Sequence, residues 1–224
     1  MFDPPAAPSL PIAGATERFP VRRVHCIGRN YAAHAIEIGH DPDREPPFFL
    51  LKNPDNLASS GESPTPTQTS DVHHGAEPAV VLRPGSTNIA VDAAFDHVLG
   101  YALALDMARR DLQGAMMTAG RPWEIGKAFE RYAPIGPVHP VALVGHPAQG
   151  ARAVRVNGTL RQEGDFAQMI WNVPEMISHL SAYVALGAGD VILSGTPSGD
   201  APVQPGDLMD VALDGVASLS VRVV

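Results

Sequence analysis

The chain has 224 residues, 45% hydrophobic and 18% charged, which supplies enough apolar surface for one substantial core. Its formal net charge is −8 with histidine neutral, and lysine and arginine do not cluster, so a nucleic-acid binder is excluded. The single cysteine, Cys26, cannot form an internal disulfide. No apolar stretch approaches the roughly 20 residues of a membrane helix, and the start of the chain does not resemble a signal peptide. We therefore expect a soluble, cytoplasmic protein that binds neither nucleic acid nor membrane.

The first twenty residues are rich in proline and alanine without hydrophobic periodicity, which predicts an extended N-terminal arm over 1–20. In chain order, hydrophobic patterning then predicts a strand at 21–27, a helix at 31–38, a strand at 48–51, an irregular loop at 53–71, a strand at 76–82, a helix and a strand within 91–106, a helix at 109–119, a hairpin at 153–162, a helix at 173–186, and strands at 191–194, 208–213 and 218–224. The polar segment 39–47 is expected to be a loop that closes over bound ligand. Without repeats or linkers, residues 21–224 predict one strand-dominated α+β domain.

Acidic and histidine side chains at four positions suggest chemistry. His34 and Glu37 lie three residues apart on a predicted helix, where the carboxylate would orient the imidazole as a base, although such pairs are usually solvated surface pairs. Glu77 lies within an apolar strand, where an unpaired carboxylate is costly to bury. Asp106 ends another apolar run, and by itself would more often be a helix cap. Carboxylates of this kind suit a hard divalent cation, with water or substrate oxygens as further ligands.

Several common catalytic patterns are absent. The sequence has no glycine-rich dinucleotide turn, no Walker loop and no His-Glu-x-x-His motif. The segment 195–199 only superficially resembles the nucleophile elbow of serine hydrolases. Nucleotide-binding, zinc-protease and serine-hydrolase functions are therefore not expected.

A set of short motifs, in order and at matching spacing, resembles the fumarylacetoacetate hydrolase family from about residue 21 to the end of the chain. These are Gly28-Arg29-Asn30-Tyr31 followed by His34 and Glu37, Phe49-Leu50-Leu51-Lys52, His73-His74-Gly75-Ala76-Glu77, Gly100-Tyr101 through Asp106, Arg110-Asp111-Leu112-Gln113, Gly126-Lys127-Ala128-Phe129, Asn157-Gly158 and Gly195-Thr196-Pro197. Within the family, segments 20–23, 40–47 and 135–140 most resemble fumarylpyruvate hydrolases of gentisate degradation.

The resemblance implies a mixed β-roll that forms a homodimer. It also implies Mg²⁺ or Mn²⁺ held by three carboxylates, with the substrate bound to the metal through its 2-oxo acid end. Glu77 and Asp106 match the second and third carboxylates. Gly75 occupies the position of the first, and losing that carboxylate removes both a charge and a ligand. Water, His74 or Asp71 could supply the missing ligand, and the sequence does not decide between them. The resemblance therefore implies weak metal binding.

The resemblance also implies roles for six other residues. His34, oriented by Glu37, would take a proton from the attacking water, and Lys127 would stabilise the developing oxyanion. Arg110, Gln113 and Thr196 match positions that bind the substrate.

Three functions remain open at this point. The first is a metal-dependent hydrolase that cleaves a carbon-carbon bond of fumarylpyruvate, or a similar 2,4-dioxo acid, to give fumarate and pyruvate. The second is a weakly active or inactive family member that binds a dicarboxylate, which Gly75 would favour. The third is a 2-oxo acid decarboxylase or isomerase on the same fold.

Overall fold

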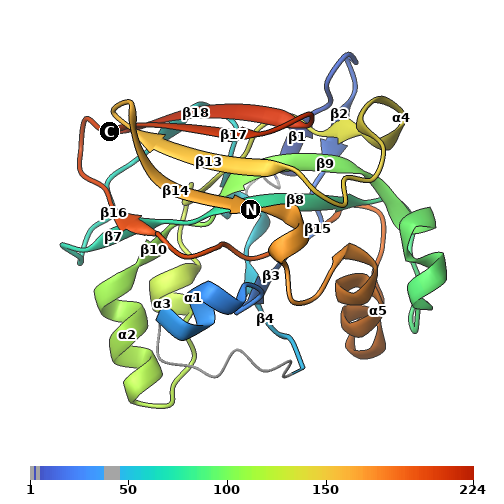
Figure 1. Cartoon of the computed structure of the whole chain (residues 1–224), viewed down its shortest axis with the longest axis horizontal. Coiled ribbons are helices and arrows are strands. Elements are labelled where there is room, and N and C mark those ends of the chain that lie inside the picture. Colours follow the sequence, from blue (N-terminus) through green and yellow to red (C-terminus); the bar gives the residue numbers. More distant parts are fainter. Residues whose placement is uncertain (1–2, 4–5, 38–45) are drawn as a thin grey trace.

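The computed structural model describes residue 3, residues 6–37 and residues 46–224, and for residues 34, 35 and 37 it describes the backbone alone. Strands dominate, and helices lie along the outside of the sheets (Figure 1). This is the mixed α+β architecture that the sequence predicts, and the expected fold class is confirmed. Within the described residues, no helix is both long and apolar enough to cross a membrane.

The larger sheet has six strands, and its order brings distant parts of the chain together. The order is β12 (His139–Pro140), β9 (Val98–Leu105), β8 (Ala76–Leu82), β15 (Asp190–Leu193), β3 (Arg23–Gly28) and β4 (Phe48–Lys52). Strands β15 and β3 are parallel, whereas the other neighbours are antiparallel, so the sheet is mixed. The apolar run predicted at 76–82 forms β8, near the middle of this sheet.

Strand β8 is buried along its whole length because both faces of the sheet are covered. Val80 and Leu82 contribute to a core that also includes side chains of the second sheet. Ala79 and Val81, which point the opposite way, pack in a second core. Glu77 is therefore carried by a rigid, fully enclosed element.

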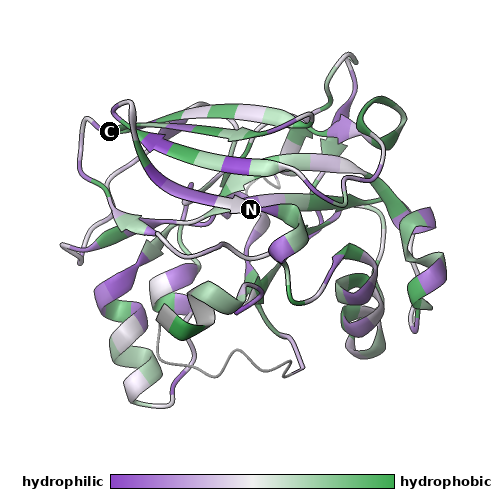
Figure 2. Cartoon of the chain, in the orientation of Figure 1, coloured by the Kyte–Doolittle hydropathy of each residue, from purple (hydrophilic) through white to green (hydrophobic). Residues whose placement is uncertain are grey.

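The second sheet has five strands and presents a polar edge to solvent. Its order is β14 (Thr159–Asp165), β13 (Ala151–Val156), β17 (Leu208–Leu213), β18 (Ala217–Val223) and β6 (Glu62–Ser63). The edge strand β14 is hydrophilic and mostly exposed (Figure 2). The predicted Asn157-Gly158 turn joins β13 to β14, and both residues have positive φ, 51° and 79°, as this tight hairpin requires.

The remaining elements are short. The α-helices are α1 (Ala32–Glu37), α2 (Arg110–Thr118), α3 (Glu124–Lys127), α4 (Val141–Val144) and α5 (Val173–Tyr183), and the 3₁₀ helices are η1 (Pro54–Asn56), η2 (Val91–His97) and η3 (Phe166–Gln168). A three-stranded sheet contains β10 (Ala108–Arg109), β7 (Val72–His74) and β16 (Ala201–Pro202), and a two-stranded sheet pairs β11 (Ala133–Pro134) with β5 (Leu57–Ala58). Three predictions differ from these bounds. The helix predicted within 91–106 is the 3₁₀ helix η2, and the helix predicted at 173–186 is α5, which ends three residues earlier. The predicted loop 53–71 includes the short strands β5 and β6.

The N-terminal segment is more ordered than its composition suggests. Strands β1 (Ser9–Pro11) and β2 (Arg18–Pro20) pair with each other in antiparallel orientation. Leu10 and Phe19 at their centres are buried in the second core. Three-residue strands are too short to show periodicity, which is why the sequence predicts only an extended arm here. The loop closure predicted for 39–47 falls mainly on residues 38–45, outside the described part of the chain.

Candidate active site

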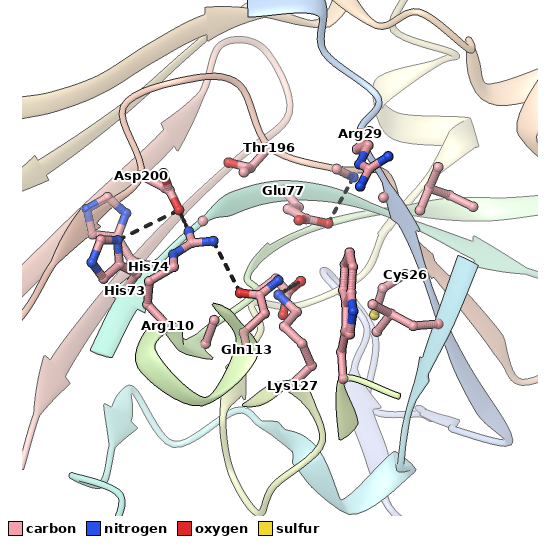
Figure 3. Close-up of a pocket in the computed structure, with 18 of the residues that line it drawn as sticks. Cys26, Arg29, His73, His74, Glu77, Arg110, Gln113, Lys127, Thr196 and Asp200 are labelled. Atoms are coloured by element: carbon pink, nitrogen blue, oxygen red, sulfur yellow. Dashed lines mark hydrogen bonds and ion pairs between the residues drawn. The ribbon is translucent and has the colours of Figure 1, made fainter. Parts of the chain in front are cut away.

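One pocket, a cavity of about 100 Å³, collects most of the residues that the sequence singles out. Its walls come from β3, β4, β7, β8, the end of β9, the helices α2 and α3, and the segment after β15 (Figure 3). Six predicted site residues line it: Glu77, Asp106, Arg110, Gln113, Lys127 and Thr196. Residues up to 119 positions apart in the chain therefore meet at one site.

Glu77 is a buried carboxylate with a backbone donor. It is 4% exposed, and the N–H of Gly195 donates to its Oε2 at 2.9 Å. Burial, together with the nearby charge of Asp106, raises the pKa of Glu77 to about 8, although Lys127 and the Gly195 hydrogen bond oppose the rise. A cation beside Glu77 would stabilise its ionised form.

Asp106 is held between two ammonium groups. Lys127 Nζ lies 2.5 Å from its Oδ2, and Lys52 Nζ lies 3.0 Å from its Oδ1. Burial by itself would raise the pKa of Asp106, but Lys127 and Lys52 outweigh it and hold the pKa below the usual value. Asp106 is therefore ionised at neutral pH and fixed in orientation.

Lys52 is a site residue that the sequence analysis did not assign. Its side chain is fully buried, and besides Asp106 it donates to the carbonyl oxygens of Lys127 and of Met107, the latter at 3.3 Å. These contacts tie β4 to the residue after Asp106 and to the end of α3. A lysine directly after the apolar run 48–51 is the signal that could have identified it, because a lysine is seldom buried without a charged partner.

Gly75 lies where the family resemblance places the first of the three metal-binding carboxylates. A Cβ there would meet Thr196 Cγ2 at 3.1 Å and the Asp106 carbonyl oxygen at 3.4 Å, and the backbone angle is not one reserved for glycine. Thr196 would have to move by a few tenths of an ångström to admit a larger side chain. The position is crowded, but it is not closed to substitution.

The donor set fits a hard divalent cation with two charged ligands. Glu77 and Asp106 line the same pocket and interact electrostatically. Among the described residues, no group of three or more histidine, cysteine and acidic side chains is placed to hold a metal ion. His74 and Asp71 therefore do not complete a three-residue site, and Asp71 instead pairs with His73 at 3.0 Å. Water or substrate oxygens would have to fill the other positions.

Arg110 and Gln113, one helical turn apart on α2, form a connected pair. Arg110 Nη1 donates to Gln113 Oε1 at 3.2 Å, and Arg110 Nη2 contacts Asp200 Oδ2 (Figure 3). Asp200 lines the pocket as well. The sequence analysis did not assign Asp200, because it follows the Gly-Thr-Pro turn in a polar segment without a pattern of its own.

Thr196 is fixed by Gln162. The Thr196 hydroxyl donates to the carbonyl oxygen of Ala76 at 2.9 Å and accepts from Gln162 Nε2 at the same distance. Gln162, 2% exposed, also donates to the carbonyl oxygen of Pro197 at 2.8 Å. Since the one hydroxyl hydrogen is already donated, Thr196 can offer a substrate its backbone N–H rather than its hydroxyl.

His34 and Glu37 lie on α1, as predicted, three residues apart. Their side chains are outside the part of the chain that the structure describes, so their contact with the pocket stays a prediction. Gly28 and Arg29, just before α1, line the pocket. The helix thus begins next to the site.

The fold agrees with the comparison to known families. The family described as "Fumarylacetoacetate (FAA) hydrolase C-terminal" matches residues 23–224, and the chain belongs to this family. Within the family, the chain is 49% identical to a fumarylpyruvate hydrolase from Pseudomonas aeruginosa, whose crystal structure holds Mn²⁺ and pyruvate. That match covers 100% of this chain and 98% of the other, with a TM-score of 0.97.

Two curated relatives carry out other reactions. An oxaloacetate tautomerase of Escherichia coli is 37% identical over 214 residues, which cover 94% of this chain and 96% of the relative. A mitochondrial oxaloacetate decarboxylase of Dictyostelium discoideum is 36% identical over 197 residues, covering 87% and 90%. Family members therefore include hydrolases, tautomerases and decarboxylases, and the chain belongs to a family of enzymes.

Proposed function

We propose that this protein is a metal-dependent hydrolase that cleaves a carbon-carbon bond of fumarylpyruvate, or a related acylpyruvate, to give fumarate and pyruvate. One observation carries the proposal: Glu77, Asp106 and Lys127 surround one pocket in a chain that is 49% identical, over its whole length, to a fumarylpyruvate hydrolase. The reaction adds water across the bond between the acyl carbon and the methylene carbon. The acyl part leaves as fumarate and the remainder as the enolate of pyruvate, which then takes up a proton.

Glu77 and Asp106 are the residues that would hold Mg²⁺ or Mn²⁺. A bound divalent cation supplies Lewis acidity at the 2-oxo acid end of the substrate, which favours departure of the enolate. The Mn²⁺ and pyruvate in the Pseudomonas aeruginosa hydrolase support a divalent cation and a 2-oxo acid as ligands. Lys52 and Lys127 fix the Asp106 carboxylate, so its geometry is set before the ligand arrives.

His34 is the base in this proposal. Its imidazole, oriented by Glu37, takes a proton from the water that attacks the acyl carbonyl. Lys127 provides a positive charge in the pocket wall, which stabilises the oxyanion that forms on that carbonyl. The 2.5 Å contact with Asp106 keeps the Lys127 ammonium in place.

Arg110, Gln113 and Thr196 are the proposed substrate-binding residues. Arg110 offers a cation, and Gln113 offers its amide nitrogen because its carbonyl oxygen already accepts from Arg110. Thr196 offers its backbone N–H. Together they supply donors for the polar groups of a dioxo acid.

A second function is favoured by a specific observation. Curated relatives at 36–37% identity are an oxaloacetate tautomerase and an oxaloacetate decarboxylase. Both reactions need an enolate to be stabilised but no attacking water, so the same pocket would serve them; in the tautomerisation a base has to move a proton between carbon and oxygen instead of activating water. Gly75 favours a further possibility, that the protein is a family member with weakened metal binding and low turnover.

Parallel assays separate these functions. The purified protein is incubated with fumarylpyruvate and with oxaloacetate, with added Mg²⁺ or Mn²⁺ and with a chelator, and products are identified by NMR. We expect metal-dependent formation of fumarate and pyruvate in equal amounts. Rapid tautomerisation or decarboxylation of oxaloacetate without any cleavage of fumarylpyruvate would instead establish the second function.

We also propose that the protein works as a cytoplasmic homodimer. The family resemblance supports the dimer, and the single buried thiol of Cys26, with no internal disulfide to form, fits a reducing compartment. Gel filtration coupled to light scattering measures the assembly, and a monomer at micromolar concentration would contradict the dimer.

A further inference from the structure

Arg110, which we propose as a substrate ligand, already forms an ion pair with Asp200 in the pocket wall. Arg110 Nη2 contacts Asp200 Oδ2, and Asp200 has only 10% of its side chain exposed. Arg110 comes from the start of α2, whereas Asp200 follows the Gly-Thr-Pro turn, so the pair connects two separate walls. Figure 3 shows it on the side of the pocket with His73 and His74, away from Cys26 and Arg29.

The charges of Arg110 and Asp200 cancel within the pair, and His73 separates the pair from a second carboxylate, Asp71. His73 Nδ1 lies 3.8 Å from Asp200 Oδ2, and His73 Nε2 lies 3.0 Å from Asp71 Oδ1. Burial and the charge of Arg110 lower the pKa of His73, so its ring is neutral near pH 7 and adds no positive charge. Asp200 therefore neutralises Arg110 locally, in a partly buried setting where an ion pair is less screened than at the surface.

We propose that Asp200 is a specificity-determining residue that competes with a substrate carboxylate for Arg110. The inference rests on the proposed function, in which a divalent cation held by Glu77 and Asp106 would take the 2-oxo acid end and Arg110 is left for the acyl end. A carboxylate on the acyl arm has to displace Asp200 before it can pair with Arg110. An acyl arm without a carboxylate leaves the Arg110–Asp200 pair intact.

This competition has two consequences for the substrate class. The pocket binds acylpyruvates with a carboxylate on the acyl arm less tightly than Arg110 alone would allow, and it also accepts acylpyruvates with an uncharged acyl arm. A dicarboxylate product such as fumarate is released more readily for the same reason, because Asp200 returns to Arg110 as the product leaves.

The test compares ligands with and without the second carboxylate in the native protein and in Asp200→Asn. The substitution keeps the shape of the side chain and removes its charge. We expect it to lower the Kd of fumarate, measured by calorimetry, and the KM of fumarylpyruvate by about 10-fold. The KM of acetylpyruvate, whose acyl arm is uncharged, should not change.

Two matched controls isolate the mechanism. Asp71→Asn removes a negative charge from the same cluster but leaves the Arg110–Asp200 pair in place, so it should not tighten fumarate binding. Adding Arg110→Met to Asp200→Asn should abolish the gain in fumarate affinity. Thermal unfolding monitors folding of each variant, and Asp200→Ser is the second variant if Asp200→Asn is unstable.

The outcomes are distinguishable from a failure of the proposed function. Fumarate binding is measured without turnover, so tighter binding in Asp200→Asn supports the competition even if no acylpyruvate is hydrolysed, and in that case only the proposed reaction fails. An unchanged Kd for fumarate in folded Asp200→Asn, or an equal gain in Asp71→Asn, would overturn the inference.

Discussion

At the scale of single residues, the proposed metal site is tested best at Gly75. A carboxylate at this position would add a charge and a ligand beside Glu77 and Asp106. We expect Gly75→Glu to tighten Mn²⁺ binding by about 10-fold or more and to raise turnover at low metal concentration. Titration calorimetry on the native protein and the variant measures the affinity directly.

The control for this variant is Gly75→Ala. It introduces the Cβ, 3.1 Å from Thr196 Cγ2, without the carboxylate, and so measures the effect of crowding alone. If the native protein already binds Mn²⁺ tightly and Gly75→Glu changes neither affinity nor rate, then another residue completes the site and the ligand assignment is wrong.

His34 is the second residue whose substitution is informative. Removing a positioned general base should lower the rate of hydrolysis by roughly 100-fold or more while leaving metal affinity nearly unchanged. Steady-state rates of His34→Ala, with circular dichroism as a folding check, test this. Ile36→Ala is the matched control, since Ile36 lies on the same helix and is 60% exposed. Near-normal turnover by a folded His34→Ala protein would remove His34 from the mechanism.

At the scale of elements, the hairpin between β13 and β14 depends on Asn157. Its side chain donates to Asp207 Oδ1 at 2.8 Å and accepts from the N–H of Leu208 at 3.0 Å, which ties the turn to the start of β17. Its φ of 51° disfavours most other residues. Asn157→Ala should therefore lower the free energy of unfolding by about 1–2 kcal/mol.

Urea denaturation measures this loss, and Thr159→Val, at an exposed position two residues further on, is the control. A loss below a few tenths of a kcal/mol in Asn157→Ala would mean that the strands, rather than the turn, set the register of this hairpin.

Long or well-marked elements were predictable from the sequence. The apolar run 76–82 matches β8, and Asn157-Gly158 marks a hairpin, because each signal is local and strong. The β1–β2 pair was not predictable. Its strands have three residues each, and its stability comes from burying Leu10 and Phe19 against a core formed by later parts of the chain.

The same reasoning separates the site residues that sequence identified from those it did not. Glu77 and Asp106 stand out because carboxylates are unusual within or beside apolar strands. The only local signal of Lys52 is its place directly after the apolar run 48–51, and Asp200 carries no such local signal. Their roles depend on their partners Asp106 and Arg110, which lie 54 and 90 positions away in the chain and come close only through the fold.

At the scale of the whole molecule, buried histidines make stability depend on pH. Burial lowers the pKa of His25 and of His74 to about 4. In the unfolded chain a histidine has a pKa of about 6.5, so between pH 6.5 and 4 the unfolded state binds more protons than the folded state. Stability is therefore fully present above about pH 6.5 and falls as the pH drops toward 4.

His25 is the better test because it lies outside the pocket. Both of its ring nitrogens are buried without a hydrogen-bond partner among the described residues. The folded state keeps His25 neutral at pH 5, whereas the unfolded state protonates it. The free energy of unfolding should therefore be about 2 kcal/mol lower at pH 5 than at pH 7 because of His25. Urea unfolding of the native protein and His25→Leu at both pH values gives the difference, and equal pH dependence of the two proteins would show that His25 does not contribute.

The central claim, that the protein adds water across a carbon-carbon bond of an acylpyruvate, is tested most directly by isotope labelling. Fumarylpyruvate is turned over in water enriched in ¹⁸O with saturating Mn²⁺, and the products are analysed by mass spectrometry. The proposed mechanism predicts one ¹⁸O atom in the new carboxylate of fumarate, an equal amount of pyruvate, and no reaction with a chelator. Absence of fumarate at every Mn²⁺ concentration would contradict it.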